Sequence, residues 1–263
     1  MKNRITEELK SLRGAIKSLD RKVVIIFIAV SLLQTISWYV TSMRFFRTNF
    51  YDTFFADNPN VSLYEYIYWF AGDFVTLFVC PVLIIKFTFK EKLSDYGINF
   101  KEAGLGFLIT LIFTFVMVII IWFCSSSREF AEYYPMLSST RNNWVFFLVF
   151  QIFLLIFIIA WEFIWRGFMI FGLKGKFGFY AILIQMIPFV ILHNGKPAAE
   201  TFGAIAGGLA LGILAYRTGS IFYGVIIHYM VMFMIDFLSI MRFKLDDFGT
   251  GINSLFHILS KIF

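Results

Sequence analysis

Charged residues are scarce in this sequence. Only 15% of the 263 residues are charged, whereas 59% are hydrophobic and 21% are aromatic, and 36 residues are phenylalanine. A soluble domain carries about 25% charged residues. The chain therefore has too few charges to cover a water-facing surface, and the composition indicates an integral membrane protein.

Cysteine is also scarce, with two residues in the whole chain. Cys80 and Cys124 lie in apolar runs and lack the spacing of a metal site. They predict neither a disulfide framework nor a zinc site. The net charge of +6 would suit a nucleic-acid partner, but the basic residues stand at the ends of apolar runs rather than on one face. We therefore expect no nucleic-acid partner.

Apolar runs alternate with short polar joints along the chain. About 20 apolar residues cross a bilayer core of roughly 30 Å as a helix. We predict an all-α, polytopic membrane helix bundle with about seven spans, within a range of six to eight. The expected spans are about 23–43, 64–87, 104–124, 144 into the region of residue 162, 179–193, 201–216 and 221–241.

We expect one membrane domain with four parts. An amphipathic cytoplasmic segment (1–22) precedes N-terminal spans (23–143), a core that carries the polar motifs (144–241) and an amphipathic tail (242–263). Basic residues are most frequent in the first 22 residues and after the second, fourth and sixth runs. The positive-inside rule then predicts a cytoplasmic N-terminus. The first basic stretch is too long for a cleavable signal peptide.

A glutamate and an arginine lie inside the fourth apolar run. Glu162 and Arg166 are four residues apart, so they share one helix face and are close enough to pair. A charge at the bilayer centre costs roughly 2.5–3.5 kcal/mol on insertion scales, so it persists where it pairs or faces a functional cavity. The pair marks either a functional site or a structural ion pair that pins two helices.

Two histidines extend this polar set. His193 stands at the end of the fifth run, four residues after Phe189, and His228 lies in the middle of the last run. In a shared pocket Glu162 would activate water as a general base, while the two imidazoles would orient the water and an oxyanion. We predict these three residues as catalytic. The predicted supporting residues are Arg166, Phe189, Asp236 and Trp161.

No cofactor is expected. The motif HExxH of zinc hydrolases is absent. Glu162, His193 and His228 have the residue types of a catalytic zinc set of two histidines and one glutamate, but this possibility rests on residue types alone and is not favoured.

Three segments in order resemble the motifs of a known family. WEFIWRG (161–167) is similar to EExxxR, FVILH (189–193) matches FxxxH, and HYMVM (228–232) approaches HxxxN or HxxxD. These are motifs of the CPBP intramembrane proteases, the CAAX-processing and bacteriocin-processing, Abi-like proteins. The resemblance covers about 144–241. It implies a bacterial plasma-membrane peptidase that acts on a membrane-associated peptide or protein, with or without a lipid group, and contacts membrane lipid.

Two positions depart from the family pattern. Trp161 stands where the family has its first glutamate, and Met232 stands where the third motif has Asn or Asp. Neither side chain can take a proton or hold an oxyanion. Glu162 would then act alone, desolvated by the neighbouring Trp161 indole, and Asp236 would replace the missing polar group. Otherwise proteolysis has been lost.

Three functional classes therefore remain open. The first is an intramembrane endopeptidase for CAAX-like or leader-peptide processing. The second is a noncatalytic protein of the same fold that binds other proteins or helps them mature. The third is a small proton-coupled transporter with a relay of Glu162, Arg166 and Asp236. The sequence has no paired, Gly/Pro-broken spans in two similar halves, which argues against the third class.

Overall fold

The computed structural model describes residues 2–261; Met1 and the end of the predicted tail, Ile262 and Phe263, lie outside the described residues. The elements of the described part are all helices, as predicted. In chain order, the α-helices are α1 (Lys2–Lys17), α2 (Arg21–Tyr39), α3 (Met43–Asn49), α4 (Val61–Phe74), α5 (Cys80–Leu83), α6 (Ala103–Cys124), α7 (Arg128–Tyr133), α8 (Trp144–Glu162), α9 (Gly172–Phe177), α10 (Tyr180–Ile191), α11 (Ala198–Thr218), α12 (Phe222–Leu245) and α13 (Ile252–Leu259).

Shorter helical segments of other pitch extend or join these helices. Four are π-helical: η1 (Tyr51–Phe55), η2 (Val75–Val79), η3 (Ile84–Phe89) and η6 (Phe163–Phe171). Two are 3₁₀ helices: η4 (Leu93–Tyr96) and η5 (Ser138–Arg141). The π-helical segments continue their α-helical neighbours, so α4 to η3 and α8 to α9 each form one long rod.

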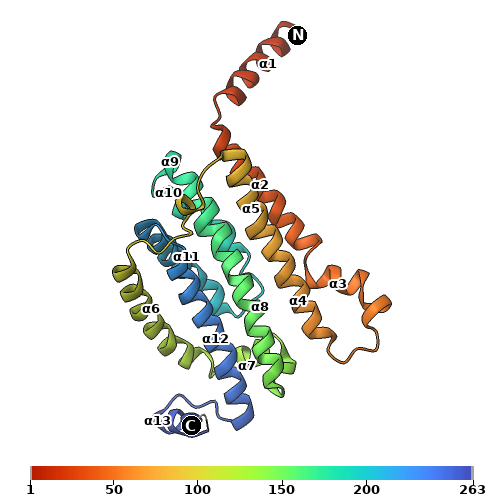
Figure 1. Cartoon of the computed structure of the whole chain (residues 1–263), viewed down its shortest axis with the longest axis vertical. Coiled ribbons are helices and arrows are strands. Elements are labelled where there is room, and N and C mark those ends of the chain that lie inside the picture. Colours follow the sequence, from red (N-terminus) through yellow and green to blue (C-terminus); the bar gives the residue numbers. More distant parts are fainter. Residues whose placement is uncertain (1, 262–263) are drawn as a thin grey trace.

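The predicted membrane helix bundle is confirmed, with six long spans in the described residues. The helices that are long and apolar enough to cross a membrane are Arg21–Tyr39, Val61–Phe89, Ala103–Cys124, Trp144–Phe177, Ala198–Thr218 and Phe222–Leu245. The remaining predicted span is α10, which has 12 residues and so rises only about 18 Å. This is less than the roughly 30 Å of a bilayer core. The chain turns back after α10 and continues as α11 (Figure 1).

The rod of α8 and η6 is the centre of the bundle. All nine residues of η6 are buried, and α4, α10 and α12 contact the rod. In Figure 1, α6 and α12 lie on one side of the rod and α4 on the other. By contrast, α6 exposes large apolar side chains such as Leu111 and Phe115, which suits contact with lipid. The centre of the bundle is thus formed by the helix that carries Glu162.

Close approach of α6 and α12 depends on Gly106. A Cβ atom at Gly106 would lie 2.4–2.6 Å from ring atoms of Tyr223, whereas a Cβ at Gly104 would meet no atom within 4 Å. We expect Gly106→Ala to lower the free energy of unfolding by about 1–3 kcal/mol because of overpacking. Gly104→Ala is the matched control and should be neutral or stabilising by up to about 1 kcal/mol. Thermal unfolding in one detergent compares them; equal midpoints for both variants would contradict this packing.

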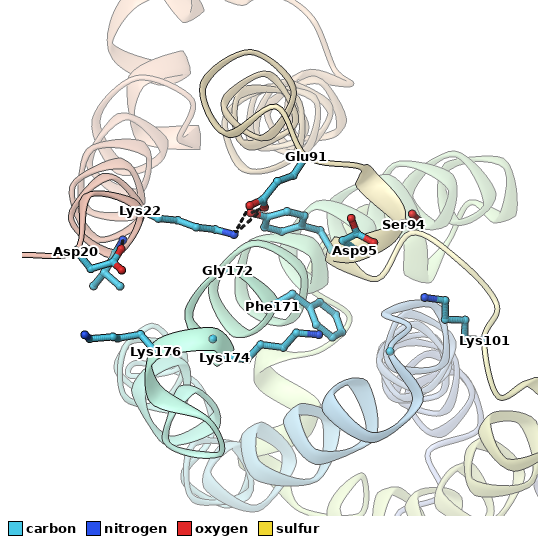
Figure 2. A pocket seen from close by; sticks show the side chains of 14 residues that line it. Asp20, Lys22, Glu91, Ser94, Asp95, Lys101, Phe171, Gly172, Lys174 and Lys176 are labelled. Carbon is cyan, nitrogen blue, oxygen red and sulfur yellow. Dashed lines mark hydrogen bonds and ion pairs between the residues drawn. The ribbon is translucent and has the colours of Figure 1, made fainter.

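Lysine side chains gather at the end of the bundle from which α1 projects (Figures 1 and 2). Lys22 pairs with Glu91 at 2.7 Å, and the Tyr96 hydroxyl donates a hydrogen bond to the same carboxylate. Lys22 and Glu91 line a surface pocket, and the other lysines of this pocket are Lys101, Lys174 and Lys176. These residues come from basic segments that the sequence assigns to one side of the membrane. The cytoplasmic location of that side stays a prediction.

The predicted amphipathic tail is anchored by Arg242. The Arg242 guanidinium is buried and donates hydrogen bonds to the Ser125 hydroxyl and to the backbone carbonyls of Asp247 and Gly249. Beyond these carbonyls, α13 exposes Phe256 among other apolar side chains. Arg242 therefore ties the start of the tail to the end of α6.

Candidate active site

Glu162, Arg166 and His228 form one buried ionic cluster between the central rod and α12. Glu162 Oε1 accepts hydrogen bonds from Arg166 Nη1 at 3.1 Å and from His228 Nδ1 at 2.7 Å. The side chains of Glu162 and Arg166 are fully buried, whereas the His228 side chain is 13% exposed. The pair predicted from spacing is therefore present, and it holds the ring of His228.

A glycine lets α12 approach the carboxylate. A Cβ at Gly224 would lie 3.0 Å from Glu162 Oε2. Gly224 is four residues before His228 and shares its helix face, so any larger side chain would crowd the carboxylate that His228 contacts. The short contact between Glu162 and His228 thus depends on the absence of a side chain one turn away.

His193 follows the last turn of α10, and its ring is oriented by the backbone. Its Nδ1 lies 2.7 Å from the carbonyl oxygen of Phe189. Because a carbonyl oxygen can only accept, Nδ1 carries the proton, and Nε2 of the neutral ring is left as an acceptor. The spacing FxxxH therefore has a physical meaning here: the residue four positions earlier fixes the tautomer of the histidine.

The ring of Phe189 lies against both histidines and the Arg166 guanidinium group. Its ring centroid lies 4.5 Å from that of His193 and 6.4 Å from that of His228. The Arg166 guanidinium carbon stands 4.2 Å from the same ring, which is cation–π geometry. One aromatic ring thus connects both histidines to the buried ion pair.

Both histidines face one cavity of about 370 Å³ between α6, α10, α11 and α12. Its wall is apolar except at three ionisable side chains, His193, Glu200 and His228. The small residues that open it on the α11 side are Ala199, Gly203, Ala204, Ala206, Gly207 and Ala210. Glu162 lies behind His228 and is not part of the wall. The cavity combines an apolar interior with few polar groups, as ligand sites commonly do.

Of the other two predicted supporting residues, Trp161 lies at the site and Asp236 does not. The Trp161 ring contacts the rings of Phe189 and His193, with centroids 6.2 and 6.4 Å apart. Asp236 is fully buried and accepts hydrogen bonds from Gln151 Nε2 at 3.0 Å and from the Met136 backbone N–H at 3.4 Å. Asp236 therefore faces α8 and the loop before it, rather than the cavity.

Met232 occupies the wall position that follows His228 by one turn. The structure thus places a thioether, instead of a polar group, next to the cavity-facing imidazole. This is the position at which the sequence departs from the third motif.

Sequence reasoning missed Glu200. This residue lies in the first turn of α11, and its carboxylate accepts hydrogen bonds from Lys196 Nζ at 2.5 Å and from the Tyr134 hydroxyl. A signal was present, because Lys196 and Glu200 are four residues apart on either side of Pro197, the residue before the helix.

Within residues 2–261, no group of three or more His, Cys, Asp or Glu side chains is arranged to hold a metal ion. Glu162 and His228 contact each other, while the ring nitrogen of His193 bonds to the Phe189 carbonyl. The geometry therefore offers an imidazole pair on a cavity wall, with a carboxylate behind one ring.

Comparison with known proteins gives one match. Residues 142–234 match the family described as type II CAAX prenyl endopeptidase Rce1-like. No curated protein and no solved structure matches the chain. The matched segment begins just before α8 and ends within α12, so it contains Glu162, Arg166, His193 and His228. The resemblance carried by the three motifs is thereby confirmed: the segment 142–234 is Rce1-like, consistent with the CPBP/CAAX protease family.

Proposed function

We propose that this protein is an intramembrane endopeptidase that hydrolyses a membrane-associated peptide by direct attack of water. The observation that carries the proposal is the pair of histidines, His193 and His228, on the wall of one apolar cavity. A buried carboxylate stands behind one of them. The Rce1-like match of the same segment supports this reaction class.

Each imidazole suits one part of the hydrolysis. His193 presents an Nε2 lone pair, because its Nδ1–H is bound to the Phe189 carbonyl, and it can therefore hold a water molecule. His228 donates its Nδ1–H to the Glu162 carboxylate, and in its imidazolium form the ring also carries an N–H at Nε2. Its Nε2–H can then donate to the oxyanion of a tetrahedral intermediate.

Glu162 fits a positioning role better than the role of base. Its Oε1 already accepts two hydrogen bonds and its side chain is 0% exposed, so water in the cavity meets His228 first. Activation of water by Glu162 itself stays a prediction from the sequence. In our proposal, Glu162 orients the His228 ring and stabilises its charge.

The apolar cavity favours a substrate with an apolar or lipidated segment. The name of the matched family includes CAAX and prenyl, and a prenylated CAAX-like end would place hydrocarbon against Gly203, Gly207 and the neighbouring apolar wall. A membrane leader peptide offers the same chemistry. We place the N-terminus in the cytoplasm, as the basic segments predict, and the protein in the bacterial plasma membrane, as the family resemblance implies.

A noncatalytic protein of the same fold is the second candidate. It is favoured by Met232 on the cavity wall, where a polar group would otherwise assist His228. Such a protein would bind the same peptides in the same cavity without cleaving them.

Filling the cavity tests the proposal. A Cβ at Gly207 meets no atom within 4 Å, and Gly207 lines the cavity. We expect Gly207→Phe to lower kcat/KM by about 10²-fold, because the new ring displaces the reacting bond. The measurement is mass spectrometry of a synthetic prenylated CAAX peptide and a leader peptide incubated with purified protein. Gly207→Ala is the control and should keep wild-type turnover, whereas full activity of Gly207→Phe would place the reaction elsewhere.

The same assay with a chelator examines metal dependence. Cleavage that survives the chelator argues against zinc, and a loss that added zinc restores identifies a metal enzyme. If the wild-type protein binds the peptides but never cleaves them, the noncatalytic candidate replaces the peptidase.

A further inference from the structure

We infer that Glu200 is the general base of this site, the group that takes the proton from the attacking water. This inference rests on the proposed peptidase function. It assigns a catalytic role to a residue outside the three motifs, in the first turn of α11.

Glu200 has the position that a general base needs. Of the side chains that line the cavity, Glu200 is the one carboxylate, and it shares the wall with His193 and His228. The Glu200 side chain is 15% exposed. A general base must come within hydrogen-bond reach of the water it deprotonates. Glu200 meets this condition from the cavity, whereas Glu162 and Asp236 lie outside the cavity wall.

The turn that carries Glu200 is tied to the turn that carries His193. Thr201 Oγ1 donates a hydrogen bond to the His193 carbonyl oxygen at 2.9 Å, and the Lys196 backbone N–H donates to the same carbonyl at 3.2 Å. The backbone N–H of Ala198 donates to Glu129 Oε1 at 3.1 Å, which fixes the start of α11 to α7. Glu200 and His193 are therefore held at a constant separation, as two groups that share one water must be.

The carboxylate itself is oriented by two donors. Lys196 donates to Oε1, and the Tyr134 hydroxyl donates to Oε2. Each carboxylate oxygen can accept two hydrogen bonds, so each keeps one acceptor site after these contacts. The Lys196 ammonium group lies against this carboxylate, and the ionised form of a carboxylate is the one that accepts a proton. Lys196 and Tyr134 are therefore positioning residues for Glu200.

The surroundings of His193 show why a second carboxylate is needed. Trp161, which directly precedes Glu162, places an indole against the His193 ring, with centroids 6.4 Å apart. An indole N–H is a donor only and cannot accept the proton of a water molecule at His193. Glu200 lines the same cavity as His193 and stands in the turn bonded to the His193 carbonyl.

The proposed step balances as an ordinary peptide hydrolysis. Water held at His193 Nε2 attacks the scissile carbonyl carbon as its O–H proton passes to Glu200. The carbonyl π electrons move to oxygen, and this oxyanion accepts a hydrogen bond from His228. When the oxyanion re-forms the C=O bond, the C–N bond breaks, and Glu200 returns the proton to the leaving amine. The products are one carboxylic acid and one amine, which together hold all the atoms of the peptide and the water, and no further reactant is needed.

Glu200→Gln tests the assignment, because glutamine keeps the size of the side chain and loses its basicity. We expect kcat for a prenylated CAAX peptide to fall by about 10²–10⁴-fold, with KM and the thermal midpoint near wild-type values. Glu132→Gln, an exposed glutamate on α7, is the matched control and should keep wild-type kcat. Lys196→Met removes the ion pair but not the base, so its loss should stay below about tenfold.

A structural role for Glu200 predicts a different result. If the ion pair alone mattered, Lys196→Met and Glu200→Gln would lose the same activity and the same thermal stability. A variant that regains activity distinguishes catalysis from folding, because a loss of folding cannot raise kcat. Trp161→Glu in the Glu200→Gln background should restore part of the lost kcat, since it places a carboxylate against His193.

The outcomes separate the two proposals. If wild-type protein cleaves the peptide, His228→Ala does not and Glu200→Gln does, then the peptidase stands and Glu200 is not its base. If neither wild-type protein nor the Trp161→Glu variant cleaves any probe, the peptidase function fails, and the role of Glu200 fails with it.

Discussion

Arg166→Met is expected to lower the free energy of unfolding by about 3–5 kcal/mol, the cost of leaving one partner of a buried ion pair uncompensated. Both side chains are fully buried, and Arg166 Nη1 lies 3.1 Å from Glu162 Oε1. Methionine has a similar length and is apolar, so the variant leaves no large cavity. The loss comes from the Glu162 carboxylate, which would keep His228 as its one remaining ionic partner.

Thermal unfolding in a single detergent measures this effect. For a chain of this size, 1 kcal/mol corresponds to roughly 2–4 °C, so the midpoint should fall by roughly 6–20 °C. The double variant Glu162→Gln with Arg166→Met removes both charges and should recover much of the loss, because no buried charge remains unpaired. A midpoint within about 2 °C of wild type for Arg166→Met would contradict a tightly coupled pair.

His228→Ala is expected to reduce kcat by about 10²–10³-fold, the usual cost of losing one oxyanion donor. The His228 ring is held by Glu162 at 2.7 Å and faces the cavity, so its Nε2–H acts mainly on charge that develops in the transition state. KM should change little, since that charge is absent in the bound substrate. Peptide hydrolysis followed by mass spectrometry gives both constants.

His193→Ala should cause a loss of similar size for a different reason. His193 holds the water through Nε2, because its Nδ1–H is bound to the Phe189 carbonyl. Since both groups act in the same step, the double variant should lose much less than the product of the two single losses. Multiplicative losses would indicate that the two histidines act independently.

The membrane helices could be predicted from the sequence because hydropathy alone sets them. Five of the six long spans fall within a few residues of the predicted runs, and the fourth begins at Trp144 as predicted but continues to Phe177. Helix α11 begins at Ala198 because Pro197 directly precedes it. Hydropathy could not show that α10 stops after 12 residues, since its length depends on how the 192–197 turn packs. The short helices α3 and α7 were also missed, because they are too brief to give a long apolar run, whereas α13 lies in the predicted amphipathic tail.

In the candidate site, too, some contacts follow from the sequence and others depend on tertiary packing. The contact of Glu162 with Arg166 follows from helical spacing. The contact of Glu162 with His228 depends on which face of α12 meets α8, and Gly224 helps to determine that face. Asp236 lies eight residues after His228, so it is rotated by about 80° on the helix and meets Gln151 on α8 instead. Glu200 reaches the cavity through tertiary packing of α11 beside α6 and α12, and no periodicity predicts this.

One comparison tests directly whether the two cavity histidines carry out peptide hydrolysis. The chain supplies its own control. It has three histidines, and the third, His257, is an exposed residue of α13 that pairs with Asp247 at 2.8 Å. The measurement is kcat for a prenylated CAAX peptide with wild-type protein, His228→Ala and His257→Ala at equal folded concentrations. If the cavity histidines carry out the reaction, His257→Ala should keep wild-type kcat and His228→Ala should lower it by about 10²–10³-fold. Equal kcat for the two variants would contradict it.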